Sequence, residues 1–69
     1  MNTRDLALFR AVVKTKNYTQ VAEQFHVSQP AVTQAIKRLE REFDAPLIKQ
    51  DHTHQQMLIN RAGQLLYNN

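Results

Sequence analysis

The side chains best suited to recognition chemistry lie on one face of a helix expected over residues 29–43. At about 100° per residue, the side of that helix opposite its apolar stripe carries amide, hydroxyl and cationic groups, with no carboxylate among them. Such a face suits the base edges and phosphates of a nucleic acid, although any one of its residues alone is explained equally well as an ordinary solvated side chain. The face comprises Pro30, Thr33, Gln34, Lys37, Arg38 and Arg41, with Gln29 at its edge in the first turn.

Each type of side chain on this face predicts a different contact with double-stranded DNA. Gln29 and Gln34 each offer a donor and an acceptor, which suits bidentate pairing with adenine, and Thr33 can hydrogen-bond a base or touch a thymine methyl. In helix-turn-helix docking, the N-terminal end of the recognition helix points into the major groove. The cations farther along the helix are therefore expected to meet phosphates and to add affinity more than specificity. They are Lys37, Arg38 and Arg41.

Capping chemistry and apolar spacing place this helix. Ser28 is the expected N-cap, because its hydroxyl can accept a hydrogen bond from a free amide of the first turn. Pro30 suits the start of a helix, where a missing N–H costs nothing. The inward face recurs at helical spacing and is predicted to be core. Its residues are Val32, Ala35, Ile36, Leu39 and Phe43.

A shorter helix is expected just before it, from residue 19 or 20 to residue 24 or 25, with Thr19 as its N-cap. Its inward side chains would be Val21, Ala22 and Phe25, and the smallness of Ala22 permits a close helix crossing. His26 is expected to form the turn in a left-handed conformation, with a ligand or pH-sensing role as the less favoured alternative. Two helices joined by a tight turn predict a helix-turn-helix.

The string AxxFHVSQPAVTQAIKRLE, residues 22–40, resembles the DNA-binding module of the LysR-type transcription regulators. Members of that family typically show A-x-x-L-x-x-S-Q-P-A-(V/L)-(S/T)-x-x-I-(K/R)-x-L-E. The similarity extends to NxxDLxLFxAVxxxxxYTxVAE before this string and to FDAPLI and NRAG after it. The resemblance implies a mainly α fold with a small β-hairpin, namely a winged helix-turn-helix of three helices, a two-stranded wing and the start of a linker helix. It also implies sequence-specific binding of double-stranded DNA as part of a transcription regulator, with the recognition helix, about residues 29–43, in the major groove.

The first helix is expected from residue 3 or 4 to Lys14 and would act as a scaffold behind the helix-turn-helix. Tyr18 is expected to pack as a hydrophobic staple ahead of the Thr19 cap, with contact to a sugar or phosphate as the less favoured alternative. The resemblance implies that the turn near residues 17–19 approaches the DNA backbone. Thr19 would then both cap its helix and meet a phosphate.

A β-hairpin is expected after Pro46, with residues 47 and 48 as one strand, residues 57–59 as its partner and residues 49–56 as the arm between them. In winged helix-turn-helix proteins such a hairpin lies along the neighbouring minor groove, which attracts cations. The family usually has an arginine at this point of the wing, which this chain lacks, and Lys49 is expected to substitute for it as a point charge.

Together these assignments predict one continuous DNA-binding surface on the helix-turn-helix and the wing. Its residues are Thr19, Ser28, Gln29, Pro30, Thr33, Gln34, Lys37, Arg38, Arg41 and Lys49.

The last ten residues read as the beginning of another helix, with Asn60 as its N-cap. The resemblance implies that residues 1–59 form the winged helix-turn-helix domain and that residues 60–69 open a linker helix that pairs with a second subunit. The apolar side chains here, Leu65, Leu66 and Tyr67, are expected to be exposed or paired in that dimer. A dimer implies an interrupted dyad operator with half-sites about 34–36 Å apart. The family's effector-binding domain is expected to be absent from these 69 residues, so a small-molecule effector would act only through that missing part.

Composition bounds the function without identifying it. With 69 residues and 42% hydrophobic content, the chain can form one small core. Nine Lys and Arg against six Asp and Glu give a net charge of +3, which modestly favours a polyanionic partner. The chain has no cysteine, and no apolar run approaches the about 20 residues needed to span a bilayer. A cytoplasmic location is therefore expected, with no membrane partner.

Catalysis, cofactors and metals are not expected. The chain shows no Ser/His/Asp or Cys/His set, no phosphate-binding glycine loop and no paired carboxylates with a third group. His52 and His54 have the i, i+2 spacing that points two side chains to one side of a strand, but two ligands do not make a zinc site.

Two alternatives to the LysR-type interpretation share much of this evidence. One is another winged-helix regulator, such as a MarR-like protein, which the SQPAVTQAIKRLE string disfavours. The other is a winged-helix module that binds proteins and no DNA, which the absence of acidic residues on the recognition face disfavours.

Overall fold

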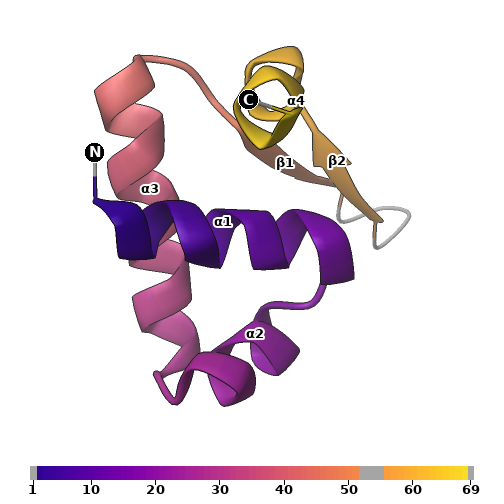
Figure 1. Cartoon of the computed structure of the whole chain (residues 1–69). Helices are drawn as coiled ribbons and strands as arrows, with labels where there is room; N and C mark the ends of the chain where they lie inside the picture. Colours follow the sequence, from indigo (N-terminus) through magenta and orange to yellow (C-terminus); the bar gives the residue numbers. More distant parts are fainter. Residues whose placement is uncertain (1, 52–55, 69) are drawn as a thin grey trace.

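The computed structural model describes residues 2–51 and 56–68, which form four helices and one antiparallel hairpin (Figure 1). The first and third helices cross one another, the second helix packs below them, and the hairpin and fourth helix lie together at the opposite end. The elements are α1 (Thr3–Thr15), α2 (Tyr18–Phe25), α3 (Gln29–Phe43), β1 (Ile48–Asp51), β2 (Gln56–Ile59) and α4 (Arg61–Asn68). This arrangement is the predicted winged helix-turn-helix followed by a further helix.

Polar side chains begin each of the first three helices. The Asn2 side chain accepts a hydrogen bond from Arg4 N at 2.8 Å, and the Ser28 hydroxyl accepts one from Ala31 N at 3.2 Å, as predicted for α3. The cap of α2 is Asn17, whose Oδ1 accepts from Gln20 N at 3.0 Å. The prediction of Thr19 as this cap was therefore wrong. Asn17 lies two residues earlier and is a stronger cap than threonine, and it starts the helix at Tyr18.

Each of these helices ends at a non-glycine residue in the left-handed conformation. The φ angles are 54° at Lys16, 56° at His26 and 51° at Asp44. The prediction for His26 is confirmed. Helices commonly end in this conformation, usually at glycine, and asparagine, aspartate and histidine tolerate it better than most other residues. The chain's one glycine lies elsewhere, inside α4.

Two groups of buried side chains form the core and share the α1–α3 crossing. The first group joins α1, α2 and α3, and it consists of Leu8, Val12, Val21, Ala22, Val32 and Ala35. The second joins α1 and α3 to the chain before β1 and to α4, and it consists of Phe9, Val13, Ile36, Leu39, Leu47 and Leu66. The predicted stripe of α3 is confirmed except at its last residue. Phe43 is 43% exposed, because α3 extends past the end of the core there.

Tyr18 packs against both core groups and is half-buried. Its predicted packing role is confirmed, but the hydrophobic-staple geometry is wrong, since Tyr18 follows the Asn17 cap and is the first residue of α2.

The hairpin pairs β1 with β2 in a register that runs from Ile48 opposite Ile59 to Asp51 opposite Gln56. Both strands extend farther into the predicted arm than expected, since β1 continues to Asp51 and β2 begins at Gln56. Leu47 lies just before β1 and not within it, and it is fully buried. His52 and His54, weighed above as metal ligands, lie outside the described residues.

The start of α4 lies very close to the chain that precedes β1. A Cβ placed on Gly63 would lie 2.9 Å from Ile59 Cγ2 and closer still to the Leu47 carbonyl oxygen. Such distances are shorter than side chains normally adopt, so this close approach requires glycine.

The apolar residues of α4 do not share one environment. Leu66 is buried in the second core group, Tyr67 is half-buried, and Leu65 is 65% exposed. Arg10 of α1 donates from Nη2 to the Tyr67 carbonyl at 3.0 Å, with its guanidinium carbon 5.9 Å from the centre of the Tyr67 ring. The prediction that all three residues would be exposed or paired with a second subunit was therefore wrong for Leu66, because α4 turns back onto α1.

An ion pair also fixes α3 against α1. Arg38 donates from Nε and Nη2 to the two carboxylate oxygens of Asp5, each at 2.8 Å. Asp5 is buried, at 4% exposure. The hydrogen bonds from Arg38 lower the pKa of the Asp5 carboxyl below its ordinary value of 3.8, against a smaller opposing effect of burial.

Replacing Gly63 with alanine is expected to destabilise the fold by about 1–3 kcal/mol, because the added methyl overlaps a backbone carbonyl that cannot rotate away. Helix propensity alone predicts the opposite sign, a gain of about 1 kcal/mol. Urea unfolding measures the difference, with Gln64→Ala at the exposed neighbouring position as the control. A variant as stable as the wild type would contradict the close approach.

Replacing Asp5 with asparagine is expected to lower stability at pH 7 by about 1–3 kcal/mol, because Arg38 loses its charged acceptor at a buried site. A lowered folded-state pKa stabilises the fold above the unfolded pKa, and this stabilisation disappears as pH falls through the folded pKa. The stability difference between the wild type and Asp5→Asn should therefore begin to shrink as pH falls below about 4, and it should vanish once pH is below the lowered pKa of Asp5. Thermal unfolding from pH 7 to pH 3 measures this, with the exposed Asp44→Asn as the matched carboxylate control. A stability difference independent of pH would contradict it.

Candidate nucleic-acid-binding surface

The N-terminal half of α3 presents the predicted recognition side chains together on the surface. Gln29, Pro30 and Gln34 are exposed, and Thr33 is half-buried. These four residues line a shallow hollow of about 300 Å³. The Thr33 hydroxyl lies 3.4 Å from the Gln29 carbonyl oxygen, a long hydrogen bond that leaves the hydroxyl available to a better partner. The α3 backbone thus groups one hydroxyl and two amide side chains within the reach of a single ligand.

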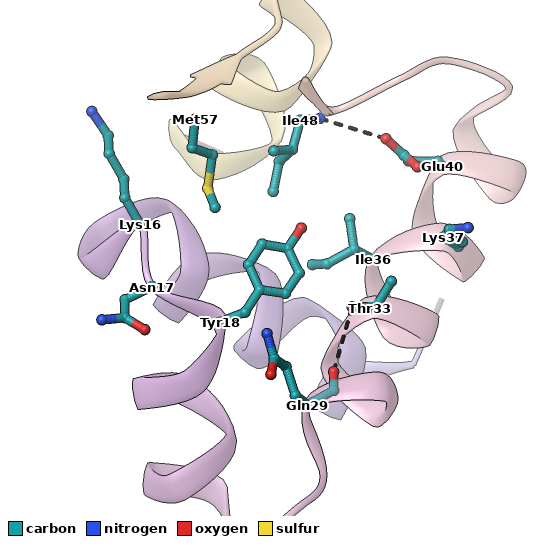
Figure 2. A pocket seen from close by; sticks show the side chains of 10 residues that line it. All are labelled: Lys16, Asn17, Tyr18, Gln29, Thr33, Ile36, Lys37, Glu40, Ile48 and Met57. Carbon is teal, nitrogen blue, oxygen red and sulfur yellow. Dashed lines mark hydrogen bonds between the residues drawn. The ribbon is translucent and has the colours of Figure 1, made fainter. Parts of the chain in front are cut away.

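A larger groove of about 530 Å³ opens between α3, the turn from α1 to α2, and the hairpin (Figure 2). Figure 2 shows Tyr18 in the middle of this groove, between α3 on one side and Lys16 and Asn17 on the other. The lining residues are Lys16, Asn17, Tyr18, Gln29, Thr33, Ile36, Lys37, Glu40, Ile48 and Met57. The groove therefore brings three parts of the sequence to one face.

Lys16 belongs to this surface, although the sequence did not single it out. It is exposed, ends α1 in the left-handed conformation, and directs its ammonium group away from Tyr18 (Figure 2). Lys37 approaches the same groove from α3. The sequence does place Lys16 directly before the Asn17 cap, and this position could have marked it as a candidate site residue. The proximity of Lys16 to α3, however, depends on the path of the turn.

Glu40 is the acidic group of the groove and was also missed as a site residue. Its side chain is half-buried, and Oε2 accepts hydrogen bonds from Leu47 N at 2.9 Å and from Ile48 N at 3.5 Å. Burial raises the pKa of the Tyr18 hydroxyl, and the negative charge of Glu40 raises it further. Tyr18 is therefore a protonated phenol, able to donate a hydrogen bond into the groove.

Arg38 is placed differently from the other predicted cations. Its side chain is 51% exposed, but two of its donors are held by Asp5. Lys37 and Arg41 are exposed and share a second shallow hollow beside the C-terminal end of α3. The ion pair gives Arg38 a structural role, because it joins α3 to α1. The predicted contact of Arg38 with a phosphate stays a prediction.

Besides Pro30, Gln34, Arg38 and Arg41, which are described above, three more predicted residues do not line the groove. Thr19 is exposed in the first turn of α2, Ser28 is exposed at the N-cap of α3, and Lys49 is exposed on β1 opposite Leu58. Thr19 and Lys49 are each next in sequence to a residue that lines the groove, Tyr18 and Ile48 respectively.

Within residues 2–51 and 56–68, no group of three or more His, Cys, Asp or Glu side chains is arranged to hold a metal ion. No helix in that part of the chain is long and apolar enough to cross a membrane.

Residues 3–64 match the family model described as bacterial regulatory helix-turn-helix protein, lysR family. The chain is 42% identical over 66 residues to the malolactic fermentation system transcriptional activator of Lactococcus lactis, covering 96% of this chain and 23% of that protein. It is 35% identical over 66 residues to the dual regulator OxyR of Escherichia coli, covering 96% of this chain and 21% of that protein. The chain thus spans about a fifth of the length of these curated relatives.

Solved structures of the same kind superpose closely. A LysR-family transcriptional regulator from Eggerthella lenta has a TM-score of 0.89 at 35% identity, covering 99% of this chain and 94% of that one. The CbnR DNA-binding domain in complex with DNA has a TM-score of 0.87 at 29% identity, covering 99% of this chain and 76% of that one.

Proposed function

The chain belongs to the lysR family of bacterial regulatory helix-turn-helix proteins, and we propose that it binds double-stranded DNA sequence-specifically as the DNA-binding module of a transcription regulator. The observation that carries this proposal is the exposed face of α3. On that face, two amides and a hydroxyl precede the exposed cations Lys37 and Arg41. Membership of the family decides against the MarR-like alternative. Recognition without catalysis is the proposed activity.

Base readout is assigned to the N-terminal half of α3. Gln29 and Gln34 are exposed and lie on the same hollow, so both can present a donor and an acceptor to a base edge. The close fold similarity to a domain complexed with DNA supports this orientation, in which α2 crosses the backbone while α3 enters the major groove. Pro30 and Thr33 would contact the same groove through apolar atoms and a hydroxyl.

Phosphate contacts are assigned to the cations and the hydroxyl around this half-helix. Lys37 and Arg41 extend from α3, and Lys16 adds a charge from the turn before α2. Thr19, in the first turn of α2, would meet the backbone with its hydroxyl, and Lys49 would approach the minor groove from β1. These contacts would supply affinity that depends on salt.

The remaining proposals concern the whole protein of which this module would be a part. The relatives are several times longer, so we assign effector binding to sequence outside these 69 residues. Exposed Leu65 on α4 is a candidate contact for a second subunit, and a dimer would bind an interrupted dyad. A cytoplasmic location follows from a role on bacterial DNA.

Gln34→Ala is expected to weaken binding to the preferred duplex by about 1–3 kcal/mol and to relax base preference at one position of each half-site. Selection from random duplexes with wild type and variant measures both effects. Gln64→Ala, at an exposed position of α4, is the control and should leave the selected sequence unchanged. If Gln34→Ala selects the wild-type sequence with equal stringency, then Gln34 does not read a base.

Lys37→Ala is expected to weaken binding to preferred and scrambled duplexes alike, because a phosphate contact is independent of sequence. The slope of log affinity against log salt should fall in magnitude by about 0.9 for the lost contact. Titrations at several salt concentrations measure the slope, with Arg61→Ala on α4 as a control that removes an equal charge outside the groove. A slope that changes equally in both variants would indicate an effect of net charge alone.

A further inference from the structure

We propose that Glu40 is a positioning residue that fixes the β1–β2 hairpin against α3, and that DNA binding depends on this placement. The second half of the proposal rests on the proposed function, whereas the first concerns the fold alone. Glu40 stands on α3 at the edge of the groove and reaches toward the first residue of the hairpin (Figure 2).

Glu40 holds the connection from α3 to β1 at two points. Its backbone carbonyl accepts a hydrogen bond from Ala45 N at 3.1 Å, just after the helix ends. Its carboxylate accepts a hydrogen bond from Leu47 N at 2.9 Å and a long, weaker one from Ile48 N at 3.5 Å, at the start of the strand. One residue therefore determines the path of the chain from the end of the recognition helix into the wing.

The backbone of Leu47 connects Glu40 to the end of the hairpin through hydrogen bonds. Its N–H is bound by Glu40, and its carbonyl accepts a hydrogen bond from Asn60 N at 2.9 Å, at the exit of β2. The Asn60 carbonyl in turn accepts from Gln64 N at 2.9 Å, in the first turn of α4. These bonds connect α3, both ends of the hairpin and α4, and Gly63 allows α4 to approach the Leu47 carbonyl.

Among the described residues of the hairpin, apolar side chains also pack against the helices. Ile48 packs against both core groups, Met57 against the first and Ile59 against the second. Apolar packing is non-directional, whereas hydrogen bonds to a carboxylate are directional and stronger than neutral ones. The carboxylate of Glu40 is therefore the group that sets the angle between wing and recognition helix.

The charge of Glu40 is unfavourable for the proposed partner. It lies in the groove that Lys16 and Lys37 also line, on the face expected to meet phosphates. A carboxylate there repels DNA, so its value to binding is geometric and not electrostatic. When the charge is removed, loss of the positioning role predicts weaker DNA binding, whereas loss of the repulsion predicts tighter DNA binding.

The test compares Glu40→Ala and Glu40→Gln with the wild-type 69-residue chain. Glutamine keeps an acceptor oxygen without the charge, whereas alanine removes both. Glu23→Gln, at an exposed position of α2, is the control for loss of one negative charge. Residual dipolar couplings of backbone amides report the angle between the hairpin and α3 in each variant, and the couplings within α1 and α3 report that the core is folded.

The DNA arm measures affinity for a fixed duplex at fixed salt. We expect Glu40→Ala to bind about tenfold more weakly, as loss of a charge-assisted hydrogen bond would produce, and Glu40→Gln to lie between it and the wild type. If Glu40 acted only through its charge, both Glu40 variants would bind DNA more tightly than the wild type. The Glu23→Gln control shows how much tighter binding becomes when one negative charge is removed elsewhere.

The outcomes separate the two halves of the proposal. An unchanged hairpin angle in both Glu40 variants would overturn the positioning role, whatever happens with DNA. A changed angle with unchanged or tighter DNA binding would overturn the dependence of binding on the wing. Failure of the wild type to bind any duplex even at low salt would count against the proposed function, and the couplings would still decide the role of Glu40.

Discussion

The packing of α3 against α1 is the interaction on which the rest of the structure depends. One side of α3 supplies Val32, Ala35, Ile36 and Leu39 to both core groups, where they meet Leu8, Phe9, Val12 and Val13 of α1. The Asp5–Arg38 pair adds a directional contact to this non-directional one. The side of α3 that faces away from α1 remains exposed, and it carries the amides Gln29 and Gln34 and the cations Lys37 and Arg41.

The parts of the fold that could be predicted from sequence are those governed by neighbouring residues. Ser28 caps α3, His26 turns the chain in the left-handed conformation, and the apolar stripe of α3 faces the core, as local chemistry indicates. The cap of α2 was misplaced although local preference favours the residue observed, since Asn17 is a stronger cap than Thr19. Helical spacing also does not show where the core ends. Phe43 was predicted to be buried and is exposed, whereas Leu66 was predicted to be exposed or paired with a second subunit and is buried.

The parts of the candidate site that could not be predicted depend on contacts between distant segments. The sequence pattern indicates that Arg38 is an exposed cation, whereas the fold brings Asp5 of α1 into hydrogen-bond contact with it. Glu40 reads as a residue on the flank of α3 until the chain returns at Leu47. Lys16 reaches the groove only because α1 ends where α2 begins to cross α3. In each case the residue type was visible in the sequence, but its partner was fixed by the tertiary path.

Whether the exposed side of α3 enters duplex DNA is measured by mapping backbone amide shifts of the ¹⁵N-labelled chain during titration with a selected duplex. We expect saturable shifts that weaken with salt and that centre on Gln29, Thr33, Gln34 and Lys37. Amides on the exposed side of α4, such as that of Leu65, should change far less. Shifts confined to α4 and α1, or no saturable shifts at low salt, would show that α3 does not enter the duplex.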